Sequence, residues 1–423
     1  MKNQYDSYIL YTCDRNTPMN CRLRFVMKDE IDSSVMEKAV GITMPRFPYF
    51  SVRAEVNENQ SYVLVHNDAP VAVLKDHAKL PAIGSAGVNR HLLFVSYLGR
   101  EVYFNINHTF GMGHSFFHWA ISVLYQYVTM KYGVSLNCPS ILKPDSSIPD
   151  DELWEPSLEN IPEEEPLFLP KKQESFFPLK DYLNGMLNPF QKFHSYYAFT
   201  FDQKDFVGLA KNHDSSVNSL MVILMFKALA KILPENEKKI VGGVSARTAP
   251  ALGHPLAHGC FVRQLHINLD RKQAGLDLTE LGTITRGQMV LQLDESNSIA
   301  ETRSLIQYYS AIDEQKTLKD KKKYAVTRSP LRGSDAIMNS FVVSYSGNFD
   351  LGDLAEYIDS YYAISDGHLM LEVTAKGDKI YLAFQQMIRN TKYVDAFKAV
   401  LEENGISYQV EGPFKKNLPP LAL

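Results

Sequence analysis

The stretch YFNINHTFGMGHSFFHWAISVLYQY, Tyr103–Tyr127, carries the most structural information in this chain. It begins with alternating apolar and polar residues, which predict a strand that ends at Asn107-His108. Gly111 and Gly113 predict a sharp turn, and the apolar run after them predicts a long helix that ends near Gly133. A histidine at such a junction can face a cleft, and imidazole titrates near neutrality. His108 is therefore a candidate general base.

Two segments about 170 residues apart share a pattern of strand, acidic turn and helix, which indicates a duplicated architecture. The first is CRLRFVMKDEIDSSVMEKAVG, with an alternating strand and a helix that opens at Asp32. The second is SYYAFTFDQKDFVGLAKNHD. The expected inward residues are Leu23, Phe25 and Met27, then Val35, Ala39 and Ile42, in the first copy, and Tyr197, Phe199 and Phe201, then Phe206, Leu209 and Ala210, in the second.

A composition shift in the middle of the chain predicts its organisation. The stretch Pro139–Pro189 holds nine of the 21 prolines and includes the acidic run DDELWEPSLENIPEEEPLFLP. Proline removes backbone donors and blocks regular structure. We therefore expect an N-terminal subdomain over 1–140, a linker or crossover over 141–192, and a C-terminal subdomain over 193–423.

The remaining patterns alternate between helix and strand, which favours an α/β or α+β sandwich. Alternation and β-branched or aromatic residues predict strands, Lys376-Gly377-Asp378 predicts a hairpin turn, and two apolar-periodic runs predict helices. The expected strands are 61–67, 91–107 and the hairpin 368–386, and the expected helices are 215–234 and 392–405.

The composition is that of an ordinary globular protein, with 45% hydrophobic and 22% charged residues among 423. The formal charge is 44 − 48 = −4, without the excess of Lys and Arg typical of nucleic-acid or membrane-surface binders. No apolar run reaches the ~18–20 residues of a membrane span, and no signal-peptide h-region is present. The four cysteines, Cys13, Cys21, Cys138 and Cys260, form no CxxC pair. We expect a soluble, cytoplasmic protein with reduced thiols, no membrane span and no nucleic-acid partner.

Several segments resemble one protein family. The run His108-Thr109-Phe110-Gly111-Met112-Gly113 is similar to the H-x-x-x-D-G signature of the chloramphenicol acetyltransferase and condensation-domain superfamily of CoA-dependent acyltransferases. Within that superfamily, the residue pattern is most similar to that of bacterial alcohol acetyltransferase-like proteins. Other segments match in the family's order over nearly the whole chain: ITMPRFPYFSVRAEV (42–56), HTFGMGHSFFHWAISVLYQY (108–127), SSVNSLMVILMFKALA (215–230), IVGGVSARTAPALGHPLAHGCFVRQLHINLD (240–270) and FVVSYSGNFDLGDL (341–354).

The resemblance implies two related subdomains that meet at a central tunnel. It implies that His108 deprotonates an alcohol or amine, which attacks a thioester carried by coenzyme A or a phosphopantetheine arm. A hydroxyl of Ser344 or Ser346 would meet the oxyanion. Arg247 resembles the family's strand-end arginine, although an ordinary surface arginine is an equal alternative. Coenzyme A would be the co-substrate, without a metal, and a carrier protein is a further candidate partner.

One residue departs from the family pattern, because Met112 stands where the motif has aspartate. In the family that aspartate pairs with an arginine and holds the histidine loop, and methionine accepts no ion pair. A buried arginine left without its partner would cost several kcal/mol. The alternative hypothesis is therefore a catalytically silent relative that acts as a binding or assembly module. A third hypothesis is a condensation partner supplied by a carrier protein, against which the negative net charge argues mildly.

The other chemistry-bearing residues have plain explanations. His114 and His118, like His254 and His258, are spaced four apart, but no nearby carboxylate completes a metal set. We therefore expect no metal site. The basic run 316–328 (KTLKDKKKYAVTR) either attracts the phosphates of coenzyme A or is a solvated loop, and the loop is favoured.

Overall fold

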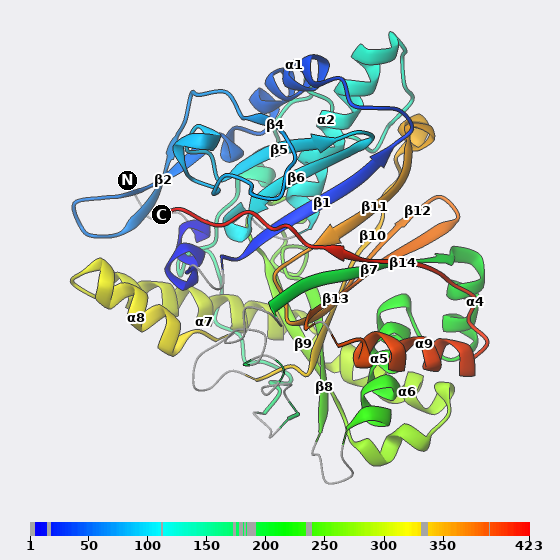
Figure 1. The fold of residues 1–423 in the computed structure, drawn as a ribbon. Helices are drawn as coiled ribbons and strands as arrows, with labels where there is room; N and C mark the ends of the chain where they lie inside the picture. The colour runs from blue at the N-terminus through cyan, green and yellow to red at the C-terminus, as the bar shows by residue number, and fades with distance from the viewer. Residues whose placement is uncertain are drawn as a thin grey trace.

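The strands of the protein form two large sheets in a computed structural model, which describes residues 5–14, 18–110, 113–171, 175–176, 181, 183, 192–233, 239–330, 337–388 and 390–423 (Figure 1). The first sheet has the order β11-β1-β6-β5-β4 and the second the order β14-β7-β13-β12-β10-β8-β9. The first comprises β1 (Asn20–Met27), β4 (Val73–Lys75), β5 (Leu93–Leu98), β6 (Glu101–Asn107) and β11 (Ile358–Ile364). The second comprises β7 (Lys192–Asp202), β8 (Ile240–Arg247), β9 (Val262–Leu269), β10 (Phe341–Asn348), β12 (Leu369–Lys376), β13 (Lys379–Ile388) and β14 (Gln409–Lys415). A separate hairpin pairs β2 (Val52–Val56) with β3 (Tyr62–His66).

The N-terminal copy of the repeated unit forms the predicted strand and helix, with a shifted buried face on the helix. Strand β1 buries its predicted inward residues beneath α1 (Ser33–Thr43) and α2 (His114–Tyr132). Helix α1 begins at Asp32, whose carboxylate accepts the backbone N–H groups of Ser34 and Val35. Ile42, expected to face inward, is instead 46% exposed. The helix buries a stripe shifted by one position, made of Met36, Ala39, Val40 and Thr43.

The second copy repeats this design in the other sheet. Strand β7 runs into α4 (Gln203–Asn212), and Asp202 caps that helix by accepting the N–H of Asp205. The apolar helix α5 (Val217–Ile232) follows, capped by Ser216. Helix α5 packs against α9 (Lys392–Glu403), and with α6 (Leu278–Gln292) these helices cover the outer face of the seven-stranded sheet (Figure 1). The predicted mixed α/β sandwich of two related halves is therefore confirmed.

Two segments of the second half cross to the first sheet. Strand β11 pairs antiparallel with β1, with Leu23 opposite Ala363. The last residues, 416–423, run beside the first sheet after β14, and we call them the C-terminal strap. Asn20 donates to the carbonyl of Pro419 at 2.8 Å, and Ala422 donates to the carbonyl of Ile83 at 2.8 Å. The two halves are therefore tied by backbone pairing as well as by side chains, and the predicted residue boundaries between them stay a prediction.

The basic run expected as a loop is a helix, α8 (Leu318–Arg328), packed beside α7 (Glu295–Asp313). Thr317 caps α8 by accepting the N–H of Asp320, which explains the helical start. Lys321 is buried and donates to the carbonyl of Asp313 at 2.9 Å. One lysine of the run therefore serves the fold and does not reach solvent.

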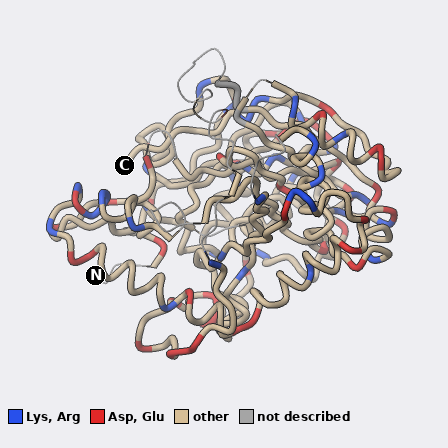
Figure 2. The backbone as a smooth tube through the Cα atoms, turned by 90° about the horizontal axis from the view of Figure 1, so that it is seen from below, with Lys and Arg blue, Asp and Glu red and all other residues tan. Residues whose placement is uncertain are grey.

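Charges of both signs occur side by side around the periphery of the molecule in Figure 2. Among the described helices, no single one has the length and apolar character to cross a membrane. Helices α4 and α5 meet that test only as a pair, and the pair is bent by 80°.

Candidate active site between the two sheets

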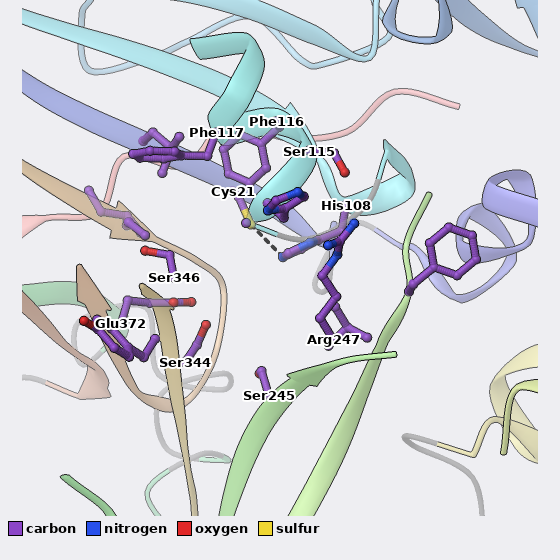
Figure 3. Close-up of a pocket in the computed structure, with 18 of the residues that line it drawn as sticks. Cys21, His108, Ser115, Phe116, Phe117, Ser245, Arg247, Ser344, Ser346 and Glu372 are labelled. Atoms are coloured by element: carbon purple, nitrogen blue, oxygen red, sulfur yellow. Dashed lines mark hydrogen bonds between the residues drawn. The ribbon is translucent and has the colours of Figure 1, made fainter. Parts of the chain in front are cut away.

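A cavity of about 190 Å³ lies where the two halves meet, and it collects most of the predicted site residues (Figure 3). His108 and Gly113 line it from the first half, and Arg247, Ser344 and Ser346 line it from the second. The other residues used below that line it are Cys21, His114, Ser115, Phe116, Ser245 and Glu372. The predicted motif residues Gly111 and Met112 lie outside the described residues. Residues more than 200 positions apart in the chain thus share one chamber.

His108 occupies the junction between β6 and α2, in a short 3₁₀ turn (His108–Phe110). Its side chain is 8% exposed, and its backbone N–H donates to the carbonyl of Met19 at 2.8 Å. The neighbouring Asn107 does not line the cavity and holds the junction from behind. Its amide donates to Pro18 and Asn20, at 2.9 and 2.8 Å, and accepts the N–H of Thr109. Asn107 therefore holds the backbone next to His108, and its role as a motif residue stays a prediction.

The thiol of Cys21 contacts the imidazole of His108 directly (Figure 3), with 2.6 Å between Sγ and Nε2. The contact follows from the register of the sheet, since Asn20 at the start of β1 lies opposite Asn107 at the end of β6. Burial raises the pKa of Cys21 well above its ordinary value, and the carboxylates of Glu372 and Asp366 raise it further. The thiol is therefore neutral and can donate its proton to the ring. The sequence analysis missed Cys21, although it shares the inward face of β1 with Leu23.

The second half contributes three neighbouring strands, β8, β10 and β12, to the wall of the cavity. Strand β10 pairs in parallel with both β8 and β12. Ser344 and Ser346 lie two residues apart on β10, and strand alternation places them on the same face. Ser344 lies opposite Glu372 of β12 and is hydrogen-bonded to its carboxylate. Burial raises the pKa of Glu372, and the bond from Ser344 opposes that rise. Glu372 was not predicted as a site residue.

Ser346 has different neighbours from Ser344, and its side chain is hydrogen-bonded to Tyr361. Its hydroxyl makes a long contact of 3.4 Å to the carbonyl of Val373. A Cβ placed on Gly113 would lie 3.9 Å from the Cβ of Ser346, so the glycine turn brings the start of α2 close to β10. Helix α2 has no side-chain cap at Gly113. Its first backbone N–H groups therefore add partial positive charge beside the Ser346 hydroxyl.

The two histidines of α2 are neutral. His114 and His118 contact each other edge to face, with ring centroids 4.5 Å apart. Burial lowers the pKa of His114 to about 3 and that of His118 to about 4. Within the described residues, no group of three or more His, Cys, Asp or Glu side chains is arranged to hold a metal ion.

Arg247 ends β8 and holds the loop that follows it. Its guanidinium donates to the carbonyl of Ala257 at 3.0 Å, and burial lowers its pKa. Among the described residues, no carboxylate lies within ion-pair distance of Arg247. The same loop carries His254, whose Nδ1 lies 2.6 Å from Asp151, and His258, whose Nδ1 lies 2.6 Å from the carbonyl of Glu152. Both histidines therefore bind the loop to the proline-rich segment 141–171 and serve the fold.

The proline-rich segment is anchored by an ion pair that the sequence analysis missed. Glu152 is buried and receives two hydrogen bonds of 2.8 Å from Arg46, and Tyr49 also donates to it. The ring of Tyr49 stacks on that of His258, with centroids 3.9 Å apart. The RFPY segment, 46–49, thus ties the first half to the crossover and to the loop after β8. In the sequence, the available signal was an arginine, Arg46, between two nearby prolines, Pro45 and Pro48.

Comparison with known proteins gives a likeness of fold. No family model matches this sequence, and no curated protein matches it significantly. Among solved structures, TRI101 of F. graminearum, in complex with coenzyme A and T-2 mycotoxin, has a TM-score of 0.61 at 13% identity, over 97% of this chain and 100% of that one. The first condensation domain of the CDA synthetase has a TM-score of 0.59 at 10% identity, over 99% and 98%.

A third solved structure is polyketide synthase associated protein 5 from Mycobacterium tuberculosis, with a TM-score of 0.57 at 11% identity over 94% of this chain and 95% of that one. These likenesses extend over whole chains, so they include both halves and the crossover between them. The resemblance read from the motifs is thereby confirmed at the level of the fold, which this chain shares with TRI101, with the condensation domain of the CDA synthetase and with polyketide synthase associated protein 5.

Proposed function

We propose that this protein transfers an acyl group from coenzyme A, or a similar thioester, to an alcohol or amine. One observation carries the proposal: the imidazole of His108 and the hydroxyl of Ser346, from opposite halves, line one cavity. TRI101, solved with coenzyme A and T-2 mycotoxin bound, shares the fold and supports a thioester donor and a small-molecule acceptor. A cytoplasmic location, where thiols stay reduced, fits this chemistry.

The reaction requires a base and an oxyanion site. The acceptor passes its proton to Nε2 of His108 as its oxygen or nitrogen attacks the thioester carbon. The oxyanion then formed is stabilised by the hydroxyl of Ser346 and by the free N–H groups at the start of α2. Collapse breaks the carbon–sulfur bond, and the leaving thiolate takes the proton from His108. Neutral His114 adds no charge that would compete at this site.

The remaining predicted residues have positioning roles in this proposal. Asn107 fixes the backbone on which His108 stands, and Ser344 is bonded to Glu372. Arg247 donates a hydrogen bond to the backbone of the loop that follows it. Its side chain is therefore oriented without an aspartate in the motif. The replacement of aspartate by Met112 is therefore compatible with a working base.

A catalytically silent binding module is the second candidate. Two observations favour it: methionine stands at the motif aspartate, and no described carboxylate pairs with Arg247. A silent protein would bind coenzyme A or a carrier arm without releasing a thiol from the thioester.

The test is release of free thiol from acyl-CoA in the presence of a panel of alcohols and amines. Phosphopantetheine thioesters belong in the same panel, because a carrier-bound donor would be mimicked by them. His108→Ala should lower turnover by about 10²–10⁴. His66→Ala, at a side chain 63% exposed on β3, is the matched control and should turn over like the wild type.

Two results would contradict the proposal. Full turnover by the His108→Ala variant would remove the base from the mechanism. A wild-type protein that releases no thiol across the panel would favour the silent module, especially if coenzyme A still raises its melting temperature.

A further inference from the structure

Arg247 brings to the cavity a positive charge that no described residue pairs. Two arginines line the chamber, and the guanidinium of the other, Arg22, is in an ion pair with Asp76. Among the described residues, the guanidinium of Arg247 makes one hydrogen bond, to the carbonyl of Ala257 at 3.0 Å. A guanidinium has five N–H donors, so most of those on Arg247 are left for a ligand.

The protein compensates this charge only weakly. In the described part of the chain, Asp151 is the carboxylate whose field reaches Arg247. Its own oxygens are bonded to His254 and to the N–H of Leu256, so it acts on the arginine through space. Burial lowers the pKa of Arg247, but a guanidinium stays protonated at neutral pH. A half-buried cation without a partner is costly, and an anion that enters the chamber recovers that cost.

Ser245 adds a hydroxyl donor to the same wall. It lies two residues before Arg247 on β8, so strand alternation places both on one face, and both line the cavity. The oxygen of Ser245 accepts from the amide of Gln264 at 3.0 Å, and it donates to no described residue. Figure 3 shows Arg247 reaching from the end of β8 toward His108, with Ser245 lower on the same strand. Guanidinium N–H groups and a hydroxyl on one face are a donor set for a carboxylate.

The rest of the chamber also suits an anion. Burial lowers the pKa of His114 to about 3, so its ring is neutral and a neutral donor or acceptor. The carboxyl of Glu372 is bonded to Ser344, and burial raises its pKa, which weakens its negative charge. The uncapped start of α2 adds partial positive charge. Phe116 and Phe261 supply an apolar wall, against which an ion pair is strengthened.

The expected anion is part of the reacting substrates and not the phosphates of coenzyme A. Those phosphates are separated from the sulfur by the whole pantetheine arm. Arg247 shares a chamber of about 190 Å³ with His108, so it meets groups that lie close to the thioester carbon and the attacking atom. A chamber of this size favours the small, planar carboxylate, which a guanidinium binds through two parallel hydrogen bonds.

We infer that Arg247 and Ser245 bind a carboxylate carried by the acyl group or by the acceptor, so that one substrate of this enzyme is acidic. This inference rests on the proposed function and deepens it. It also gives a consequence to the departure at Met112. An arginine that has no aspartate partner in the motif is available to the charge of a substrate.

Binding is tested first, without turnover, with butyrate and its neutral amide, butyramide, at equal ionic strength and pH 7. We expect butyrate to raise the melting temperature of the wild type more than butyramide does. Arg247→Gln removes the charge, while its amide still has a donor for the carbonyl of Ala257. The Kd of this variant for butyrate should be at least about tenfold higher. Arg247→Lys keeps the charge and should retain part of the affinity. Arg100→Gln, at a side chain 49% exposed outside the cavity, is the control and should bind butyrate like the wild type.

Turnover then locates the carboxylate. Succinyl-CoA and butyryl-CoA differ by a carboxylate in place of a methyl group on the acyl chain, and lactate and 2-propanol differ in the same way as acceptors. Preference for the acidic member of the first pair assigns the carboxylate to the acyl group, and preference in the second pair assigns it to the acceptor. In either case Arg247→Gln should raise KM for the acidic member at least about tenfold, and Ser245→Ala should raise it by a smaller factor.

Several outcomes would overturn the inference. These are equal stabilisation of the wild type by butyrate and butyramide, unchanged affinity of Arg247→Gln for butyrate, tighter binding of inorganic phosphate than of butyrate, and turnover without preference for an acidic substrate in either pair. An equal fall in kcat of Arg247→Gln with acidic and neutral substrates would make the arginine an oxyanion stabiliser instead. If butyrate binds through Arg247 and no substrate releases thiol, the carboxylate site holds and the proposed function fails.

Discussion

Ser344 on β10 and Glu372 on β12 lie directly opposite each other, and the serine hydroxyl is hydrogen-bonded to the buried carboxylate. Ser346, two residues further along β10, has a 3.4 Å contact to the carbonyl of Val373 and a side-chain hydrogen bond with Tyr361, and it lies beside Gly113 at the start of α2. The two predicted hydroxyls therefore differ in their surroundings, since Ser344 faces a buried carboxylate and Ser346 lies beside the start of α2. This difference makes the roles of the two serines experimentally separable.

Ser346→Ala should lower kcat by about 10²–10³, the usual cost of removing one oxyanion donor. Ser344→Ala should lower kcat by less than about tenfold, because its proton is already committed to Glu372. Both variants are to be compared in the thiol-release assay, with kcat and KM resolved separately. Equal losses in the two variants would contradict the assignment of the oxyanion donor.

Glu152→Gln should lower the free energy of unfolding by about 3–5 kcal/mol, since it leaves the buried charge of Arg46 without a partner. The two side chains are 7% and 1% exposed. Urea titration of variant and wild type measures the change. Glu55→Gln is the control, because its pair with Arg53 is 43% and 32% exposed and should contribute at most about 1 kcal/mol. Similar effects at both pairs would show that burial is not the cause.

Asp6→Asn should remove part of the dependence of stability on pH. Burial raises the pKa of Asp6 from 3.8 to about 7, although the N–H of Cys260 opposes this, and His258 lies 3.9 Å away. The folded state therefore holds a proton that the unfolded state releases. The protonated carboxyl of Asp6 therefore stabilises the folded state in full below about pH 4. This stabilisation, on the order of 4 kcal/mol, is lost as the pH rises through about 7.

The amide of the Asp6→Asn variant cannot ionise and can still accept the Cys260 N–H. The variant should thus be more stable than the wild type at about pH 8 and similar to it at about pH 4. Denaturant titrations at the two pH values measure this, with Asp68→Asn, at a side chain 96% exposed, as the control. A constant difference between Asp6→Asn and wild type at both pH values would argue against titration of Asp6.

Deletion of the C-terminal strap, residues 416–423, should destabilise the protein by several kcal/mol, because it orphans buried polar groups. Lys416 is buried and donates to the carbonyls of Ser365 and Gly367 at 3.0 Å, and Arg22 donates to the carbonyl of Asn417 at 2.9 Å. Thermal unfolding measures the loss. Deletion of Leu423 alone, at a residue 49% exposed, should have little effect. If the protein that lacks residues 416–423 kept the melting temperature of the full-length protein, the structural role of the strap would be refuted.

The sequence predicts those parts of the fold that are set by local physics. Alternation and an acidic helix cap are readable within a few residues, so the units that begin at β1 and β7 could be identified from Asp32 and Asp202. The meeting of His108 with Ser344 and Ser346 was predictable only through the order of the family motifs, since no local pattern links the two halves. The catalytic roles of these residues stay predictions.

Contacts that depend on register or on long-range pairing could not be predicted in this way. Cys21 and His108 are 87 positions apart, and a shift of β1 by one residue would turn the thiol to the opposite face. The basic run was misjudged because its charges dominate the pattern, while the Thr317 cap that starts α8 is a weaker signal. The exposure of Ile42 has a similar cause, since helical spacing alone does not decide which of two adjacent stripes is buried.

The pairing of β11 with β1 has a consequence for how the molecule can be divided. A fragment cut at the proline-rich segment would lose the neighbour of β1 and expose an open edge of its sheet, which is a template for unwanted association. The complementary fragment would carry β11 without the sheet that it completes. Fragments produced separately should therefore aggregate, and reconstitution should succeed only when both are present as folding begins.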